Sequence, residues 1–141
     1  MGREVLVDSS GLYPLADHRD PSRKRAVRIV RELLRNRACF VLTDYILDES
    51  LTLAKARAGG YAALRMLEIV EQSCAFEMSW IGPDRFEQAI TFFKKHSDQG
   101  YSFTDCTSFV LMKELGIRQA LTTDRHFLIA GFEPLLPLAE T

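Results

Sequence analysis

Short apolar runs alternate with longer amphipathic stretches along most of the chain, and this alternation constrains the fold more than any other feature. A continuous apolar run is typical of a strand buried on both faces, whereas apolar residues three and four apart are typical of a helix. Strands alternating with helices form a parallel sheet with right-handed crossovers. The predicted fold is therefore α/β, a central parallel sheet of four to five strands flanked by helices. Strands are expected at residues 4–8, 39–42, 76–81 and 119–122, with a weaker fifth one at 132–136.

Helices are predicted between these strands from apolar spacing and from end signals. The clearest covers residues 22–36, where Ala26, Val30 and Leu33 repeat opposite a charged face. Thr43 or Asp44 suits the start of a helix that Gly59-Gly60 ends. The other helices are expected at residues 9–16, with Pro14 near the start, at 61–72, at 84–96, and from Ser102 or Thr104 to Leu115 after a loop at 97–103.

Size and composition indicate one ordered domain over residues 1–141. A chain of 141 residues can bury about 68 to 70% of its unfolded surface, enough for one core without disulfides. The 47% hydrophobic and 26% charged residues match an ordinary globular protein, which excludes disorder. The three cysteines have neither zinc-site nor disulfide spacing. No apolar window approaches the roughly 20 residues that cross a bilayer, so we expect a cytoplasmic protein without membrane contact.

Four acidic residues stand where this layout places the carboxyl edge of the sheet. Asp8 ends the first apolar run, Asp124 follows the fourth, and Asp105 opens a helix-like run; Glu49 lies on the helix after residue 43. In open α/β sheets this edge is where ligands bind. Carboxylates gathered there raise one another's pKa values unless a cation joins them. Mg²⁺ or Mn²⁺, which take oxygen ligands, are the expected cofactors.

The residues around these acids resemble those of a known family. The segments are Val-Asp8-Ser-Ser-Gly-Leu, Leu-Asp-Glu49-Ser-Leu, Gly-Tyr-Ser-Phe-Thr-Asp105-Cys-Thr-Ser-Phe and Leu-Thr-Thr-Asp124-Arg-His-Phe. In this order they closely resemble the PIN-domain proteins, which include the VapC-type ribonuclease toxins, and the resemblance covers essentially the whole chain.

The resemblance implies a ribonuclease that depends on magnesium or manganese, with Asp8, Glu49, Asp105 and Asp124 as its catalytic and metal-binding residues. It also implies an antitoxin partner and a homodimer, as in many relatives. Two alternatives stay open: a PIN-domain nuclease of RNA processing outside a toxin-antitoxin pair, and a PIN-like module that binds RNA or protein without cutting.

Metal-assisted hydrolysis agrees with this residue set. A divalent ion offsets phosphodiester charge and lowers the pKa of bound water. Asp8, at a central strand end, is the expected shared ligand if two ions bind, and Ser10 and Thr122 are expected to orient the carboxylates. Asp98 is either a peripheral acid of the site or a solvated loop residue. Asp8, Asp105 and Asp124 each also suit simple helix capping, which is the structural alternative to metal binding.

Basic residues crowd the predicted helix 22–36, although the net charge is only -1. Lys24, Arg28 and Arg31 follow helical spacing and form a stripe that can contact successive RNA phosphates. A solvated helix face explains the same stripe. Arg125, beside Asp124, is a further candidate phosphate contact. His18 and His126 have no partner at catalytic spacing, so both are expected to be structural or surface residues.

Two other enzyme-like classes fit poorly. An aspartyl-phosphate phosphatase needs a second Asp two residues after the first, where this chain has Ser10. A receiver domain needs an acidic pair before the phosphorylated Asp and a Lys near a late strand, and neither pattern is present.

Overall fold

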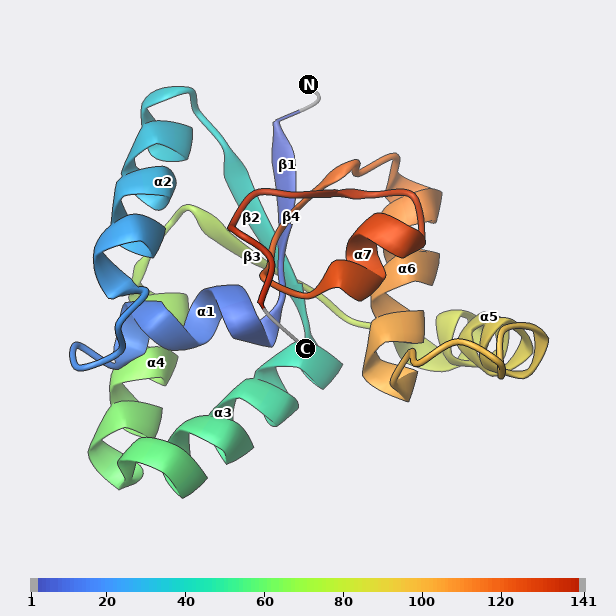
Figure 1. The fold of residues 1–141 in the computed structure, drawn as a ribbon, viewed down its shortest axis with the longest axis horizontal. Helices are drawn as coiled ribbons and strands as arrows, with labels where there is room; N and C mark the ends of the chain where they lie inside the picture. Colours follow the sequence, from blue (N-terminus) through green and yellow to red (C-terminus); the bar gives the residue numbers. More distant parts are fainter. Residues whose placement is uncertain (1–2, 140–141) are drawn as a thin grey trace.

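A five-stranded parallel sheet forms the centre of the molecule (Figure 1). The computed structural model describes residues 3–139. The strand order is β3-β2-β1-β4-β5, and every pairing is parallel. The central strand β1 pairs Leu6 with Val41 of β2 on one side and with Ala120 of β4 on the other. The strands are β1 (Glu4–Val7), β2 (Cys39–Thr43), β3 (Phe76–Ser79), β4 (Gln119–Leu121) and β5 (Glu133–Pro134).

Helices cover both sides of this sheet. Figure 1 shows α1, α2 and α4 on one side, α5, α6 and α7 on the other, and α3 leaving the end of β2 to pair with α4. The helices are α1 (Ser9–Ala16), α2 (Arg23–Arg35), α3 (Asp44–Ala58), α4 (Gly60–Gln72), α5 (Gly82–Lys95), α6 (Phe103–Leu115) and α7 (Arg125–Ile129). Among the described residues, none of these helices is long and apolar enough to cross a membrane.

The core lies between the sheet and its helices. Leu6, Leu42 and Leu121, from three adjacent strands, are fully buried. Strands buried on both faces have no polar alternation, and this explains why they appear in the sequence as continuous apolar runs. Burial of the central strands fixes the position of their carboxyl ends, where α1, α3 and α7 begin.

Close packing of α1 on β4 depends on a glycine. A Cβ atom on Gly11 would lie 2.1 Å from the carbonyl oxygen of Leu121, closer than any side chain permits. The backbone N–H of Asp8 donates to the same Leu121 oxygen at 3.2 Å. Gly11 therefore lets the start of α1 press against the end of β4, which brings residue 8 beside residue 122.

The α/β fold and parallel sheet predicted from the sequence are confirmed, but several element ends differ. The third strand ends at Ser79, because the backbone N–H of Ile81 turns to donate to the Asp44 carboxylate at 2.9 Å. The fifth strand has only two residues. Pro14 lies inside α1 and not near its start, and α7 was not predicted at all.

Candidate metal-binding site

The four predicted acids come from four different elements at the carboxyl end of the sheet. Asp8 follows β1 directly, Asp124 follows β4 after two threonines, Asp105 lies in the first turn of α6, and Glu49 lies on α3. Electrostatic repulsion links Asp8 to Glu49 and Asp105, and Asp105 to Asp124. The fold therefore gathers these carboxylates, which are far apart in sequence, at one place.

Asp8 is the most buried of the four, with 5% of its surface exposed. Its Oδ2 accepts hydrogen bonds from the hydroxyls of Thr122 at 2.8 Å and Ser10 at 2.9 Å. The Asp8 side chain does not cap α1, so capping does not account for its position. Burial raises the pKa of this carboxyl, and the nearby charge of Glu49 adds to the increase, whereas the two hydroxyls oppose it.

Ser10 and Thr122 also connect Asp8 to the segment after β4. The backbone N–H of Thr123 donates to the Ser10 hydroxyl and that of Asp124 to the Thr122 hydroxyl, each at 3.0 Å. These bonds place the two residues where they can orient both Asp8 and Asp124.

Asp105 belongs to a capping box at the start of α6. Its backbone N–H donates to the Ser102 hydroxyl, and its Oδ2 accepts from the Ser102 backbone N–H, both at 3.0 Å. Ser102, and not Thr104, is thus the N-cap. Burial raises the pKa of Asp105 to about 6, with contributions from the charges of Asp8 and Asp124. The cap occupies Oδ2, which leaves Oδ1 without a hydrogen-bond partner among the described residues.

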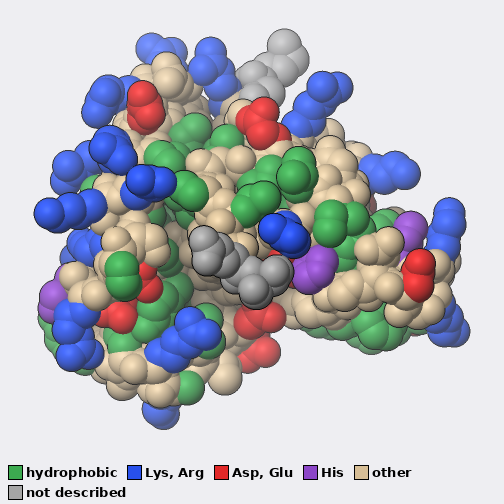
Figure 2. All heavy atoms as spheres, viewed as in Figure 1, with side chains coloured by type: hydrophobic (Ala, Val, Ile, Leu, Met, Phe, Trp, Pro, Cys, Tyr) green, Lys and Arg blue, Asp and Glu red, His purple; other side chains and the backbone are tan. Residues whose placement is uncertain are grey.

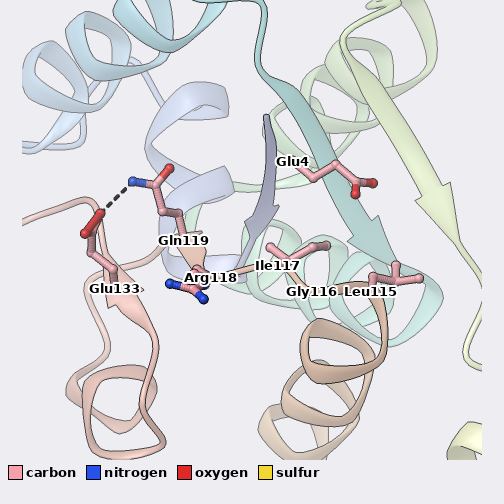
Figure 3. Close-up of a pocket in the computed structure, with 7 residues that line it drawn as sticks. All are labelled: Glu4, Leu115, Gly116, Ile117, Arg118, Gln119 and Glu133. Atoms are coloured by element: carbon pink, nitrogen blue, oxygen red, sulfur yellow. Dashed lines mark hydrogen bonds between the residues drawn. The ribbon is translucent and has the colours of Figure 1, made fainter. Parts of the chain in front are cut away.

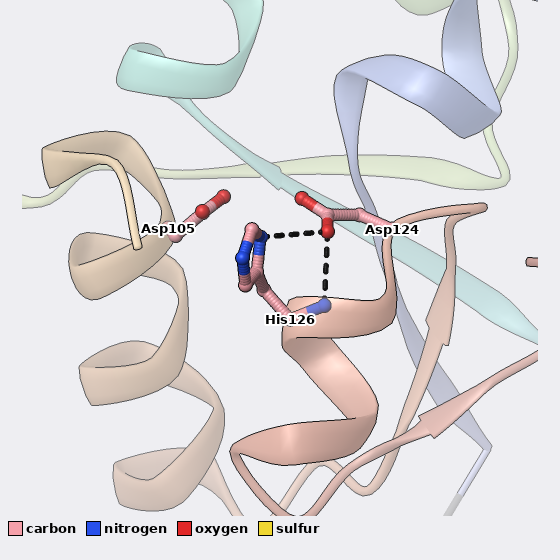
Figure 4. Close-up of side chains that lie close together, drawn as sticks. All are labelled: Asp105, Asp124 and His126. Atoms are coloured by element: carbon pink, nitrogen blue, oxygen red, sulfur yellow. Dashed lines mark hydrogen bonds and ion pairs between the residues drawn. The ribbon is translucent and has the colours of Figure 1, made fainter. Parts of the chain in front are cut away.

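Asp124 is the N-cap of α7, and its side chain contacts His126, which was expected from the sequence to be a structural or surface residue. Its Oδ1 accepts from the backbone N–H of His126 at 2.9 Å and also lies 2.9 Å from the ring Nδ1 of that residue. Ligand atoms of Asp105, Asp124 and His126 lie within 4.8 Å of one another (Figure 4). The sequence indicates this contact only by the position of His126 two residues after Asp124. The helix α7 has five residues, too few for a periodic pattern that would predict it.

Glu49 reaches the cluster from α3 and is half-buried. Its Oε1 accepts a hydrogen bond from the Ser9 hydroxyl at 2.7 Å, which ties it to the start of α1 beside Asp8. The other carboxylate oxygen accepts no hydrogen bond from the described residues. Asp48, its neighbour in sequence, is exposed.

The donor set of this cluster fits a divalent cation. It offers oxygen atoms from four carboxylates, and oxygen ligands are those that Mg²⁺ and Mn²⁺ take in proteins. No Lys or Arg of residues 3–139 forms an ion pair with these acids; their only such partner is His126. A cation would therefore offset the repulsion and desolvation that raise the pKa values of Asp8 and Asp105.

The remaining candidate residues lie outside this cluster. Asp98 is exposed in the turn after α5. Lys24, Arg28 and Arg31 are exposed along α2, and Arg125 is exposed at the start of α7. Figure 2 shows Lys and Arg side chains gathered over the α2 side of the molecule.

Two hollows of similar size lie at opposite edges of the sheet. One, of about 420 Å³, lies between the start of α2 and the segment after β4, where Ser22 and Arg25 face Thr123 and Pro137. It connects the basic helix with the neighbour of Asp124. The other, of about 400 Å³, lies at the amino edge of the sheet and is lined by Glu4, Arg118 and Glu133 among others (Figure 3). None of the four clustered acids lines it.

Comparison with known proteins gives consistent matches over most of the chain. Residues 5–133 match the family model of the PIN domain. The chain is 31% identical over 134 residues to the 23S rRNA-specific endonuclease VapC20 of Mycobacterium tuberculosis, covering 94% of this chain and 98% of the relative.

Two solved structures share the fold. The crystal structure of M. tuberculosis VapC20, described as a sarcin-ricin loop cleaving toxin, has a TM-score of 0.80 at 29% identity and covers 91% of this chain and 95% of its own. The crystal structure of FitAcB from Neisseria gonorrhoeae has a TM-score of 0.66 at 16% identity, covers 94% and 97%, and supports the fold alone.

Proposed function

The chain belongs to the PIN domain family, and from this membership we propose that it is an endoribonuclease whose four clustered carboxylates hold divalent metal ions. One observation carries the proposal: four acids from separate elements converge, and the pKa of Asp105 is raised to about 6. Buried carboxylates without a cationic partner destabilise a fold, since each costs free energy unless a cation joins it. Their retention favours a role in binding and catalysis.

The metal ligands proposed are Asp8, Glu49, Asp105 and Asp124, and the ion proposed is Mg²⁺ or Mn²⁺. Such an ion would offset the charge of the phosphodiester and supply hydroxide near neutral pH. Ser10 and Thr122 hold the Asp8 carboxylate in one orientation through two hydrogen bonds. The capping box leaves Oδ1 of Asp105 free to bind, and Asp124 can bind through Oδ2 or through the second lone pair of Oδ1.

The substrate proposed is RNA, held by the basic face of α2 and guided through the groove beside Thr123. Lys24, Arg28 and Arg31 are exposed on one side of α2, and Arg25 lines the groove that leads toward Asp124. Arg125 is a further proposed phosphate contact. Phosphate contacts position a strand without reading its bases, so they account for affinity and not for the choice of site. We also propose Asp98 as a peripheral acid of the metal site.

The relative of known activity suggests which RNA to test. VapC20 is named for 23S rRNA and its sarcin-ricin loop, and we propose a structured ribosomal RNA hairpin as the substrate class here. Purified protein with Mn²⁺ should cut a sarcin-ricin hairpin faster than a hairpin of equal length with a scrambled loop. Equal rates on both hairpins would contradict the proposed substrate class but not the proposed nuclease activity. No cleavage of either, or of total RNA, would contradict the nuclease itself.

We propose that the chain acts as a toxin in the cytoplasm, where ribosomal RNA lies. We also propose that an antitoxin protein binds it and that it forms a homodimer. Large apolar side chains remain exposed at two places on opposite sides of the molecule, on α4 and at α5. They are Tyr61, Leu64, Trp80 and Phe93. Expression of the chain alone should arrest growth, and a small protein encoded beside it should relieve the arrest. Light scattering of the purified chain measures the oligomeric state.

A further inference from the structure

His126 lies among the acids, although the resemblance to the family was used to assign a role only to the carboxylates. Figure 4 shows its ring between Asp105 of α6 and Asp124 at the start of α7, with the side chains turned toward one another. The ring Nδ1 lies 2.9 Å from Asp124 Oδ1. About 31% of the His126 side chain is exposed, so ligands from solvent can reach it.

Packing decides which ring nitrogen faces the acids. Nε2 of His126 lies beside Gly100, where a Cβ atom would be only 2.8 Å away, so that edge of the ring faces the chain at Gly100. The ring of Tyr101 packs edge-on against the imidazole, with centroids 5.7 Å apart. These contacts hold the ring in place with Nδ1 toward Asp124. The side chain is therefore oriented before any ligand arrives.

The spacing of the donor atoms matches neighbouring ligands of one ion. Metal bonds to nitrogen and oxygen of about 2.1 Å place two ligands at right angles roughly 3 Å apart. The observed distance between Nδ1 and Asp124 Oδ1 is 2.9 Å. Asp105, Asp124 and His126 each offer one ligand atom within 4.8 Å of the others, so the three side chains are close enough to converge on one ion.

We propose that Nδ1 of His126 is a nitrogen ligand of the metal site and makes that site favour first-row transition ions such as Mn²⁺ over Mg²⁺. The inference rests on the proposed function, because it concerns the same site. Mg²⁺ takes oxygen ligands in strict geometry and loses water reluctantly, whereas imidazole nitrogen strengthens binding of transition ions. The bound form carries the ring proton on Nε2, since Nδ1 must offer its lone pair.

The alternative role of His126 is a hydrogen bond. In that arrangement Nδ1–H donates to Asp124 and orients the carboxylate without touching the ion. Both roles predict weaker binding when the ring is removed. They differ in whether a histidine nitrogen is coupled to the metal, and in what asparagine does, because its amide can donate the same bond without an imidazole.

Electron spin echo envelope modulation of bound Mn²⁺ separates these roles, since it detects a directly coordinated ¹⁴N nucleus. The full chain would be loaded with Mn²⁺ as wild type, His126→Asn, His126→Ala and the control His18→Gln, which changes an exposed histidine of the loop after α1. Calorimetric titrations with Mn²⁺ and Mg²⁺ would be run on the same samples. Circular dichroism verifies that each variant is folded.

We expect a ¹⁴N coupling in wild type and His18→Gln and none in either His126 variant. The preference for Mn²⁺ over Mg²⁺ should fall about tenfold in His126→Asn, the lower end of what changes around a metal ligand cost. A folded wild type that binds Mn²⁺ without nitrogen coupling overturns the proposal, and so does an unchanged preference in His126→Asn. RNA cleavage by that protein would leave the proposed function standing, so the two failures are distinguishable.

Discussion

Replacing Asp105 by Asn should stabilise the metal-free protein at neutral pH, although it removes a proposed metal ligand. The pKa of Asp105 is raised from 3.8 to about 6, chiefly by burial. A folded state with the higher pKa binds the proton more tightly than the unfolded chain. The free energy of unfolding therefore has no penalty from this group below pH 4, decreases as the pH rises from about 4 to 6, and stays reduced above that.

The size of the effect follows from the difference in pKa. A shift of roughly two units corresponds to about 3 kcal/mol of lost stability at pH 7.5, at 1.36 kcal/mol per unit. Asparagine keeps the capping box, because its side-chain oxygen can accept from the backbone N–H of Ser102 as Asp105 does. Asparagine carries no charge, so the variant should avoid this penalty. Its free energy of unfolding at pH 7.5 should be about 3 kcal/mol higher than that of the wild type.

Urea unfolding in the presence of a chelator, at pH values from 4 to 8, measures this difference. Asp48→Asn is the matched control, since Asp48 is exposed on α3 beside Glu49. The wild type and Asp105→Asn should be equally stable near pH 4 and diverge as the pH rises. Equal stabilities at pH 7.5, or the same divergence in Asp48→Asn, would refute the reasoning that burial of this carboxylate is destabilising.

Three further outcomes follow from the structure. Gly11→Ala should lower the free energy of unfolding by about 2 kcal/mol, because the added methyl overpacks α1 on the Leu121 carbonyl. Gly60→Ala, with open space around it, should not destabilise the protein. Chemical unfolding compares the two variants, and equal effects would argue against the close contact. Saturating Mn²⁺ should raise the free energy of unfolding by about 2.7 kcal/mol at a hundred times its dissociation constant, and Asp124→Asn should reduce that gain; a melting temperature indifferent to metal would contradict the site. Replacing the exposed cations of α2 by Gln should flatten the log-log salt dependence of single-stranded RNA binding by about 2 units, and an unchanged slope would make that face a solvated or protein-binding surface; the residues are Lys24, Arg28 and Arg31.

The sequence predicts the central strands β1, β2 and β4 well because they are buried on both faces. Such strands leave continuous apolar runs, as at Val5-Leu6-Val7, and the glycines at 59 and 116 mark helix ends by their positive φ angles. Short elements leave no comparable signal. The five residues of α7 make too few turns for a periodicity, and the two residues of β5 are placed by pairing with β4.

The acids of the site were identifiable from their positions next to strand ends and helix starts, but their environment was not. Burial of Asp8 depends on how α1 packs against β4, and that packing depends on Gly11, whereas Asp105 is buried at the start of α6. His126 was missed because its role arises from a contact with Asp124 across the first turn of an unpredicted helix, and from the closeness of Gly100. Contacts of this kind are tertiary and have no periodic pattern in the sequence.

Cleavage of a labelled ribosomal RNA hairpin by wild type and Asp8→Asn, each with Mn²⁺ and with a chelator, tests the central claim most directly. Asp8→Asn keeps the shape of the side chain and the hydrogen bonds from Ser10 and Thr122, so the fold and RNA binding should persist. The account predicts cleavage only by wild type with metal. Cleavage at equal rates by folded Asp8→Asn, or by wild type in chelator, would contradict a metal-dependent site built on these carboxylates.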